Sequence, residues 1–253
     1  MPPRLILACR ERPRVDLSVI VPMHNEADNV APLVSEVRAA LDGAGLAWEL
    51  LCVDDGSDDG TRAALAAARA AEPRLRAVRH ARRAGQTAAL ASGLALARGE
   101  AIGTLDGDLQ NDPADLPRLL AVLREGGWDM VAGYRAARRD GWAKRLSSRL
   151  ANGFRRAWLH DGILDIGCST RVFWRVHATR LKLYDGLHRF LPALFVMEGL
   201  RVHQMPVNHR PRTAGRSKYG VGNRLARTLR DLGAVRWMRD RALRVEHEEI
   251  EPS

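Results

Sequence analysis

Short apolar runs alternate with longer segments of helical periodicity in the first half of the chain, and this alternation restricts the fold most. Apolar residues at helical spacing predict helices at 30–41, 61–71, 87–97 and 116–123. The apolar runs predict buried strands at 17–22, 48–53, 75–78, 101–105 and 129–132. Strands separated by helices of this length form a mostly parallel sheet that is covered on both faces. The sequence therefore predicts an α/β fold.

Polar clusters follow three of the predicted strands directly. These clusters are His24–Glu26, Asp54–Ser57 and Asp106–Asp108. Ligands of parallel sheets bind at the carboxyl ends of the strands, so a shared ligand explains three clusters at one edge better than three unrelated turns. Neither GxGxxG nor GxxxxGK[ST] occurs, which removes the main support for a dinucleotide site or a P-loop.

The stretch TLDGDLQNDP places three carboxylates close together. Asp112 is predicted to be the N-cap of the 116–123 helix, with Pro113 in the first turn. Helix entry does not explain Asp106 and Asp108, which come earlier and directly follow a strand. Two carboxylates one residue apart repel each other, and a divalent cation with oxygen ligands relieves that repulsion. We therefore expect a metal or metal-diphosphate site here.

Charge is distributed unevenly along the chain. Residues 1–131 carry 15 basic and 19 acidic side chains, a net charge of −4, whereas residues 132–245 carry 25 and 7, a net +18. Residues 246–253 add −4, which gives +10 overall. The basic second half indicates a polyanionic partner, either nucleic acid or an anionic membrane surface.

Length, cysteines and hydropathy narrow the setting. The 253 residues fit one sizeable domain, alone or with an appendage. Cys9, Cys52 and Cys168 are widely spaced, so we expect reduced thiols in a cytosolic setting, with Cys52 in the core. We identify no signal peptide. The longest apolar stretch, 190–200, is interrupted and shorter than the roughly 20 residues of a spanning helix, so the chain itself is not expected to cross a membrane.

Six motifs, in order from about Leu17 to Trp237, resemble the family 2 glycosyltransferases of GT-A fold. The resemblance is to the branch with dolichyl-phosphate mannose synthase and bacterial undecaprenyl-phosphate sugar transferases. The motifs are VIVPMHNEADNV, VDDGSDDGT, LDGDLQNDP, GYR, DIGCSTRVF and HRPRTAGRSKYG. Processive relatives carry QxxRW, but Gly233 stands here in place of the glutamine, which argues against a processive synthase.

The resemblance implies a GT-A domain with a Rossmann-like sheet over residues 16–220. An N-terminal extension at 1–15 precedes this domain, and a basic amphipathic helix with an acidic tail follows it at 221–253. The same resemblance implies a donor site in which Asp54 contacts the base and Mg²⁺ or Mn²⁺ bridges the diphosphate. The nucleotide-binding residues would be Pro22, Asn25, Glu26, Asp54, Asp55 and Asp106. The metal ligands would be Asp106, Asp108 and Gln110. Helix capping and turn formation are the structural alternatives for Glu26 and Asp54.

The resemblance also implies a phosphate acceptor, which is already anionic and needs cations more than a general base. The candidates are Arg135, Arg212 and Lys218, because guanidinium and ammonium groups bind phosphate. Ser217 and Tyr219 add hydroxyl donors. Together with Asp108 and these cations, Asp165 completes the candidate catalytic set, either as a base or as a residue that orients a partner. A solvated surface role is the alternative for any single arginine.

Two basic segments are typical of helices that lie in a membrane interface. The first carries Trp142, Leu146, Leu150, Phe154, Ala157 and Trp158 at helical spacing. The second carries Leu225, Leu229, Leu232, Val235 and Met238 among several arginines. The alternative is that each apolar face packs on the protein's own domain.

The leading hypothesis is an inverting, metal-dependent transfer of a hexose from a nucleotide sugar of GDP-mannose or UDP-glucose type to polyprenyl phosphate. We expect the chain to act peripherally at the cytoplasmic face of the membrane, on an anionic surface or with a membrane-embedded partner protein. One rival is a GT-A transferase with a hydroxyl acceptor on a glycan or small molecule. The other is a non-catalytic nucleic-acid-binding module, which the carboxylate clusters oppose because they would repel phosphates.

Overall fold

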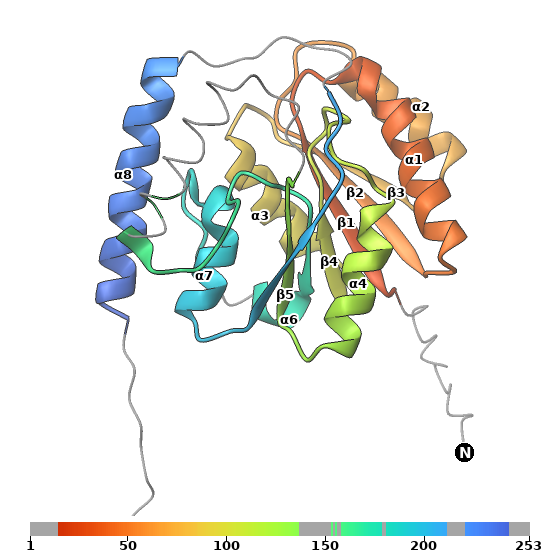
Figure 1. Cartoon of the computed structure of the whole chain (residues 1–253). Helices are drawn as coiled ribbons and strands as arrows, with labels where there is room; N and C mark the ends of the chain where they lie inside the picture. The colour runs from red at the N-terminus through yellow and green to blue at the C-terminus, as the bar shows by residue number, and fades with distance from the viewer. Residues whose placement is uncertain are drawn as a thin grey trace, which may run out of the picture.

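A seven-stranded sheet with the strand order β3-β2-β1-β4-β6-β5-β7 forms the centre of the molecule (Figure 1). The computed structural model describes residues 15–136, 153, 155, 158–178, 181–211 and 221–242, and side chains of the last helix from residue 228 onward. The strands are β1 (Leu17–Met23), β2 (Trp48–Asp54), β3 (Leu75–Arg79), β4 (Ala101–Thr104), β5 (Met130–Tyr134), β6 (Arg171–Trp174) and β7 (Val202–Pro206). All five predicted strands are confirmed.

Most neighbouring strands run parallel. Strand β1 pairs in parallel with β2 and β4, β2 with β3, and β5 with β7. Strand β6 is antiparallel to both of its neighbours, β4 and β5. We did not predict β6 or β7 from the sequence. Strand β6 begins with an arginine, so its apolar run is only Val172–Trp174, and the side chains of β7 are half-buried without clear alternation; neither leaves a strong pattern.

Helices cover both faces of the sheet, as expected. They are η1 (Ala27–Asn29), α1 (Val30–Gly43), α2 (Thr61–Ala71), α3 (Gln86–Leu96), α4 (Asp115–Glu125), α6 (Arg175–Ala178), η2 (Leu187–Phe190), α7 (Leu191–Met197) and α8 (Val221–Asp240). Helices α1, α2 and α4 lie on one side, and α3 and α7 on the other (Figure 1). The predicted apolar face of α1 is buried in full, because Val30, Leu33, Val34, Val37 and Leu41 all join the first core cluster.

Helix α8 packs on the domain through one apolar face. Leu232 and Val235 are buried against Leu187, Phe190 and Leu194 in a third cluster. This contact supports the alternative in which that face of the helix belongs to the protein's own core. Most of the predicted 142–158 helix lies outside the described residues. Within the part of the chain that the structure describes, no helix is long and apolar enough to cross a membrane.

Parallel pairing gathers the polar clusters at one edge of the sheet. Met23 is opposite Asp54 in the β1–β2 register, and Ile20 is opposite Thr104 in the β1–β4 register. The segments that follow these strands therefore emerge side by side at the carboxyl edge. Cys52 lies in the core, as predicted, and burial raises its pKa to about 12.

Candidate active site

The carboxylate of Asp54 is buried at the end of β2. Its Oδ1 accepts the Ser57 N–H at 2.9 Å, and its Oδ2 accepts Arg79 Nε–H at 3.2 Å. The hydrogen bond from Ser57 to Asp54 closes a turn, which is the structural role that the sequence analysis gave as the alternative for Asp54. A cavity of about 490 Å³ lies next to Asp54 between α2 and β3, and Arg62, Arg69 and Arg79 line it. The site thus combines a hydrogen-bond acceptor, a guanidinium and space for a ligand.

The carboxylate of Asp55 holds the loop that follows β3. Its oxygens accept the N–H groups of Ala84 and Gly85, both at 2.8 Å, and His80 Nδ1 lies at 2.8 Å. Burial acts to raise the pKa of Asp55, but these hydrogen bonds and His80 hold it below its usual value. The sequence prediction placed Asp55 on the nucleotide. In the structure its oxygens contact residues of the 80–85 loop.

The segment after β1 is joined to the segment after β2. Asn25 has a left-handed backbone conformation, with a φ of 55°, and its N–H donates to Ser57 Oγ at 2.9 Å. Asn29 Nδ2 donates to Glu26 Oε2 at 2.6 Å, and Glu26 makes no side-chain cap for η1. Pro22 is half-buried in β1 opposite Val53. Capping therefore does not account for Glu26.

Asp106 lies between two donors at the end of β4. Gln86 Nε2 donates to its Oδ1 at 3.0 Å, and Ser169 Oγ lies 2.7 Å from its Oδ2. Burial and then the neighbouring Asp108 raise the pKa of Asp106. Asp108 Oδ1 accepts the Gln110 N–H at 3.2 Å. The charge of Asp108 thus disfavours the charged form of Asp106, which is the condition that a hard divalent cation relieves.

The oxygen-rich donors of Asp106, Asp108 and Gln110 fit Mg²⁺ or Mn²⁺. Gln110 Nε2 donates to the Arg210 carbonyl at 3.3 Å, which leaves its side-chain oxygen as the atom for a ligand role. Among the described residues, no three His, Cys, Asp or Glu side chains group into a metal site. A cation here would therefore take its remaining ligands from a bound diphosphate or water.

The chain after β7 lies against this carboxylate loop. The Arg210 N–H donates to the Gln110 carbonyl at 2.8 Å, and its guanidinium lies 2.8 Å from Asp112 Oδ1. Asp112 was predicted to be an N-cap, but α4 begins at Asp115, and its N-cap position is Ala114. Asp112 caps the turn just before the helix, because its Oδ1 accepts the Ala114 N–H and its carbonyl accepts the Asp115 N–H, both at 3.1 Å. The predicted acceptor residues Arg212, Ser217, Lys218 and Tyr219 lie outside the described residues.

Arg135 and Asp165 form a bidentate ion pair at the carboxyl edge of the sheet. Arg135 Nε lies 2.7 Å from Asp165 Oδ2, and Nη2 lies 2.9 Å from Oδ1. Burial opposes the charge of Arg135, yet Asp165 raises the pKa of this guanidinium. The Gly167 N–H also donates to Asp165 Oδ1 at 3.1 Å. Both carboxylate oxygens are thus committed to donors, and Arg135 is held in one orientation.

Sequence reasoning missed a buried arginine below these groups. Arg171 on β6 is 4% exposed and donates to the carbonyls of His188 at 2.7 Å and Ile166 at 3.0 Å. Burial lowers the pKa of Arg171, and its charge acts on Asp106. His188 in turn lies 2.7 Å from Thr87 Oγ1, and burial together with nearby arginines lowers its pKa to about 3. Arg171 lies in the DIGCSTRVF motif, but no residue spacing indicated that it is buried beside the site. No sequence pattern indicated a role for His188.

The protein-family model described as glycosyl transferase family 2 matches residues 18–180 of this chain. The chain belongs to this family. It is 39% identical over 228 residues to dodecaprenyl-phosphate galacturonate synthase of Rhizobium johnstonii, covering 87% of this chain and 66% of that protein. It is 35% identical to undecaprenyl-phosphate 4-deoxy-4-formamido-L-arabinose transferase of Edwardsiella ictaluri, covering 81% and 63%. The chain thus spans somewhat less than two thirds of the length of these relatives.

Solved structures support the fold of this family 2 chain. A glucosyl-3-phosphoglycerate synthase from Mycobacterium tuberculosis, in complex with Mn²⁺, UDP and glucosyl-3-phosphoglycerate, aligns with a TM-score of 0.68 at 20% identity, covering 89% of this chain and 80% of that one. A mannosyl-3-phosphoglycerate synthase from Rubrobacter xylanophilus aligns with 0.70 at 19%, covering 94% and 79%. The expected Rossmann-like GT-A fold is confirmed.

Proposed function

We propose that this family 2 chain transfers a sugar from a nucleotide sugar to a polyprenyl phosphate, with inversion at the anomeric carbon and with a divalent cation. The observation that carries the proposal is one sheet edge with two kinds of charge. The carboxylates of Asp106 and Asp108 repel each other there, and the oriented guanidinium of Arg135 acts electrostatically on Asp106. The names of the relatives support the acceptor class.

The donor occupies the ends of β1, β2 and β4 in this proposal. Asp54 accepts an N–H of the base while Arg79 donates to a neighbouring carbonyl, a combination that suits uracil or guanine. Pro22, Asn25 and Glu26 line the rest of the nucleotide site. Asp55 contributes by holding the 80–85 loop, so it acts as a positioning residue.

The divalent cation is assigned to Asp106, Asp108 and Gln110. When bound, Mg²⁺ or Mn²⁺ neutralises the charge that develops on the leaving diphosphate. Gln86 and Ser169 fix the carboxylate of Asp106 by hydrogen bonds of 3.0 and 2.7 Å. The chain thereby supplies a preorganised anionic site whose cation-free form is electrostatically unfavourable.

The acceptor phosphate attacks as an anion, so no side chain has to remove a proton. Its oxygen forms the new bond to the anomeric carbon, the bond to the diphosphate breaks, and the leaving group takes the electron pair. Arg135, held by Asp165, brings the acceptor anion towards the donor diphosphate. We assign Arg212, Ser217, Lys218 and Tyr219 to the same phosphate from their sequence motif.

We further propose that the chain meets its lipid acceptor at the cytoplasmic face of a membrane, where it works peripherally or with a membrane-embedded partner protein. The hydroxyl-acceptor alternative requires Asp165 as a free general base. The structure favours the orienting role, because both oxygens of Asp165 accept hydrogen bonds from Arg135 or Gly167.

The deciding experiment offers purified protein a panel of UDP- and GDP-sugars with Mn²⁺ and a short-chain polyprenyl phosphate, and detects the lipid-linked sugar by mass. Arg212→Ala should reduce transfer at least about tenfold, the value of a charge-assisted contact, with little change in nucleotide affinity. Transfer to hydroxyl compounds alone would overturn the phosphate-acceptor proposal. Parallel loss of nucleotide-sugar affinity in Arg212→Ala would assign that arginine to the donor.

A further inference from the structure

Helix α8 has a second apolar strip on the side away from the core. Leu229 is 50% exposed and Trp237 is 64% exposed, although Leu232 and Val235 of the same helix are buried. Leu229 and Trp237 are separated by two helical turns, with Gly233 between them, so they project from one side. The strip is therefore distinct from the face that packs on α7.

A second exposed tryptophan lies beside α8. Trp158 is 45% exposed, and the Arg236 guanidinium of α8 lies 5.6 Å from its ring centroid. Arg236 Nη1 also donates to the Trp158 carbonyl at 2.5 Å, and Arg239 Nη1 donates to the Leu159 carbonyl at 2.6 Å. These bonds fix Trp158 beside α8. We call Trp158, Leu229 and Trp237 the outer tryptophan face.

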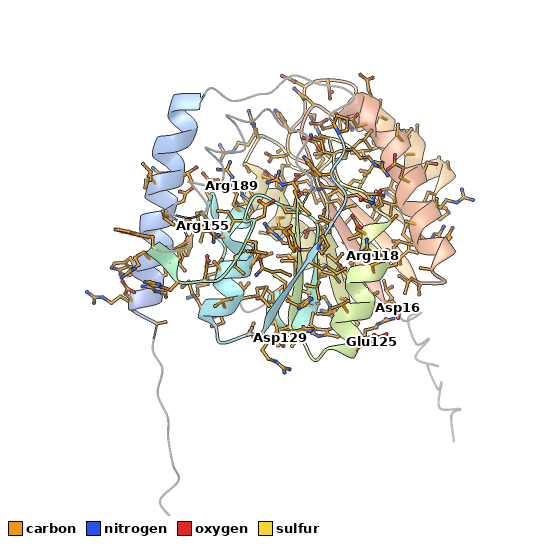
Figure 2. The ribbon with its side chains drawn as sticks, in the orientation of Figure 1. Asp16, Arg118, Glu125, Asp129, Arg155 and Arg189 are labelled. Carbon is orange, nitrogen blue, oxygen red and sulfur yellow. The ribbon has the colours of Figure 1, made fainter. Side chains whose placement is uncertain are left out.

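The rim of the outer tryptophan face is cationic. Arg230 and Arg241 are exposed, and Arg236 stands next to Trp158. The nearby Asp240 is held by Arg236 at 2.7 Å and Arg239 at 2.8 Å, and Asp231 is buried. Acidic residues Asp16 and Glu125 lie on the far side of the sheet from α8 (Figure 2). The exposed charge around the face therefore favours an anionic partner.

Tryptophan is well suited to a water–lipid boundary, because its ring is apolar and its N–H can still reach a polar group. Arginines at the rim of such a face bind lipid phosphates and add on the order of fivefold in partition per residue near an anionic surface. We propose that the outer tryptophan face docks on an anionic bilayer surface. This inference rests on the proposed lipid-phosphate acceptor. The sequence placed Leu229, Leu232 and Val235 on one strip, but Leu232 and Val235 pack on the domain, so the proposal assigns the docking contact to Leu229 and the two exposed tryptophans.

Vesicle flotation tests the docking face directly. The variants are Trp237→Ala and Trp158→Ala, and the matched control is Val176→Ser, which removes an apolar side chain that is 55% exposed elsewhere. Vesicles of phosphatidylcholine with phosphatidylserine should bind wild type and the control, and each tryptophan variant should partition at least about tenfold less. Binding should weaken with salt and without phosphatidylserine.

Unchanged flotation of both tryptophan variants would overturn the proposal, as would binding that ignores lipid charge. A wild-type dimer that dissociates in Trp237→Ala, measured by light scattering, would assign the face to a second copy instead. Transfer assays separate this proposal from the enzymatic one. Trp237→Ala should retain transfer to a short, water-soluble polyprenyl phosphate and lose transfer to a long-chain acceptor in vesicles. Absence of transfer by wild type to either acceptor refutes the enzymatic proposal, and flotation still decides the docking face.

Discussion

Replacing Asp165 with asparagine removes one charge and one acceptor from the pair that orients Arg135. The amide oxygen can replace one carboxylate oxygen, but the amide nitrogen then presents N–H groups to a guanidinium donor. The wild-type bonds of 2.7 and 2.9 Å are charge-assisted, and the side chains of Asp165 and Arg135 are 8% and 19% exposed. Breaking a buried pair costs about 3 to 5 kcal/mol, and partial exposure puts this pair at about 2 to 3 kcal/mol.

If that energy orients Arg135 for the acceptor, Asp165→Asn should slow transfer by roughly 30- to 150-fold. The assay is the initial rate of transfer to a short-chain polyprenyl phosphate, with donor affinity measured by calorimetry. Donor affinity should stay within about twofold of wild type, because Asp165 acts on the acceptor side. Asp161→Asn is the matched control, since Asp161 pairs with the buried Arg155 in another ion pair. It should affect thermal stability without a selective loss of transfer.

The double variant decides whether the two residues work as a unit. Arg135→Lys with Asp165→Asn should be no slower than the worse single variant, which means a coupling energy of about 2 kcal/mol. Losses that add within about 0.5 kcal/mol would refute the orienting role. A rate that rises with pH in wild type and becomes pH-independent in Asp165→Asn would assign Asp165 as a general base, and with it a hydroxyl acceptor.

Three further outcomes are expected. Asp108→Asn should leave the circular dichroism spectrum unchanged but reduce transfer more than about 100-fold, as should excess chelator; a fully active variant would contradict the metal assignment. Gly45 and Gly56 both have a φ of +65°, so Gly45→Ala should lower the free energy of unfolding in urea by about 1 kcal/mol. Gly56→Ala should lower it by clearly more, because its added Cβ would lie 2.6 Å from a backbone nitrogen. Equal losses would contradict a role for that contact. His188, whose pKa falls from 6.5 to about 3, stays neutral in the fold, so stability should drop as the pH falls from 6.5 towards 3, and His188→Gln should flatten that drop; an unchanged pH profile would count against it.

The parallel half of the fold was predictable because its strands coincide with apolar runs and clear helical periodicity separates them. The buried residues of α1 match the predicted positions, and the polar clusters meet at the edge that parallel pairing requires. Strands β6 and β7 escaped prediction because the apolar run of β6 is interrupted by Arg171 at its start and β7 is half-exposed, so both carry little apolar contrast. The capping prediction for Asp112 was displaced by one turn, because Asp112 caps the turn that precedes α4, and its ion pair with the distant Arg210 left no local signal.

The residues of the site were easier to predict than their partners. Asp54, Asp106 and Asp165 are marked by local motifs, and chemistry suggests ligands for each. Their contacts with Arg79 and Arg135 join positions 25 and 30 residues apart, which no local periodicity reports. Arg171 was hidden for the same reason, because its three carbonyl acceptors come from two separate segments.

The antiparallel strand β6 has a consequence for how donor and acceptor are kept at reacting distance. The strands β3, β2, β1 and β4 carry or precede the residues proposed for the donor, while β6, β5 and β7 flank Asp165, Arg135 and Arg210. The hydrogen-bonded ladder that joins these two sets spans four residue pairs, from Ala101↔Trp174 to Thr104↔Arg171, against seven in the β1–β2 ladder. A slip of one residue there would displace one set by about 3.3 Å and turn its side chains to the opposite face. In the proposed reaction, the register of this short β4–β6 ladder would therefore set the distance between donor and acceptor, and the residues of either set could change without altering that distance as long as the register is kept.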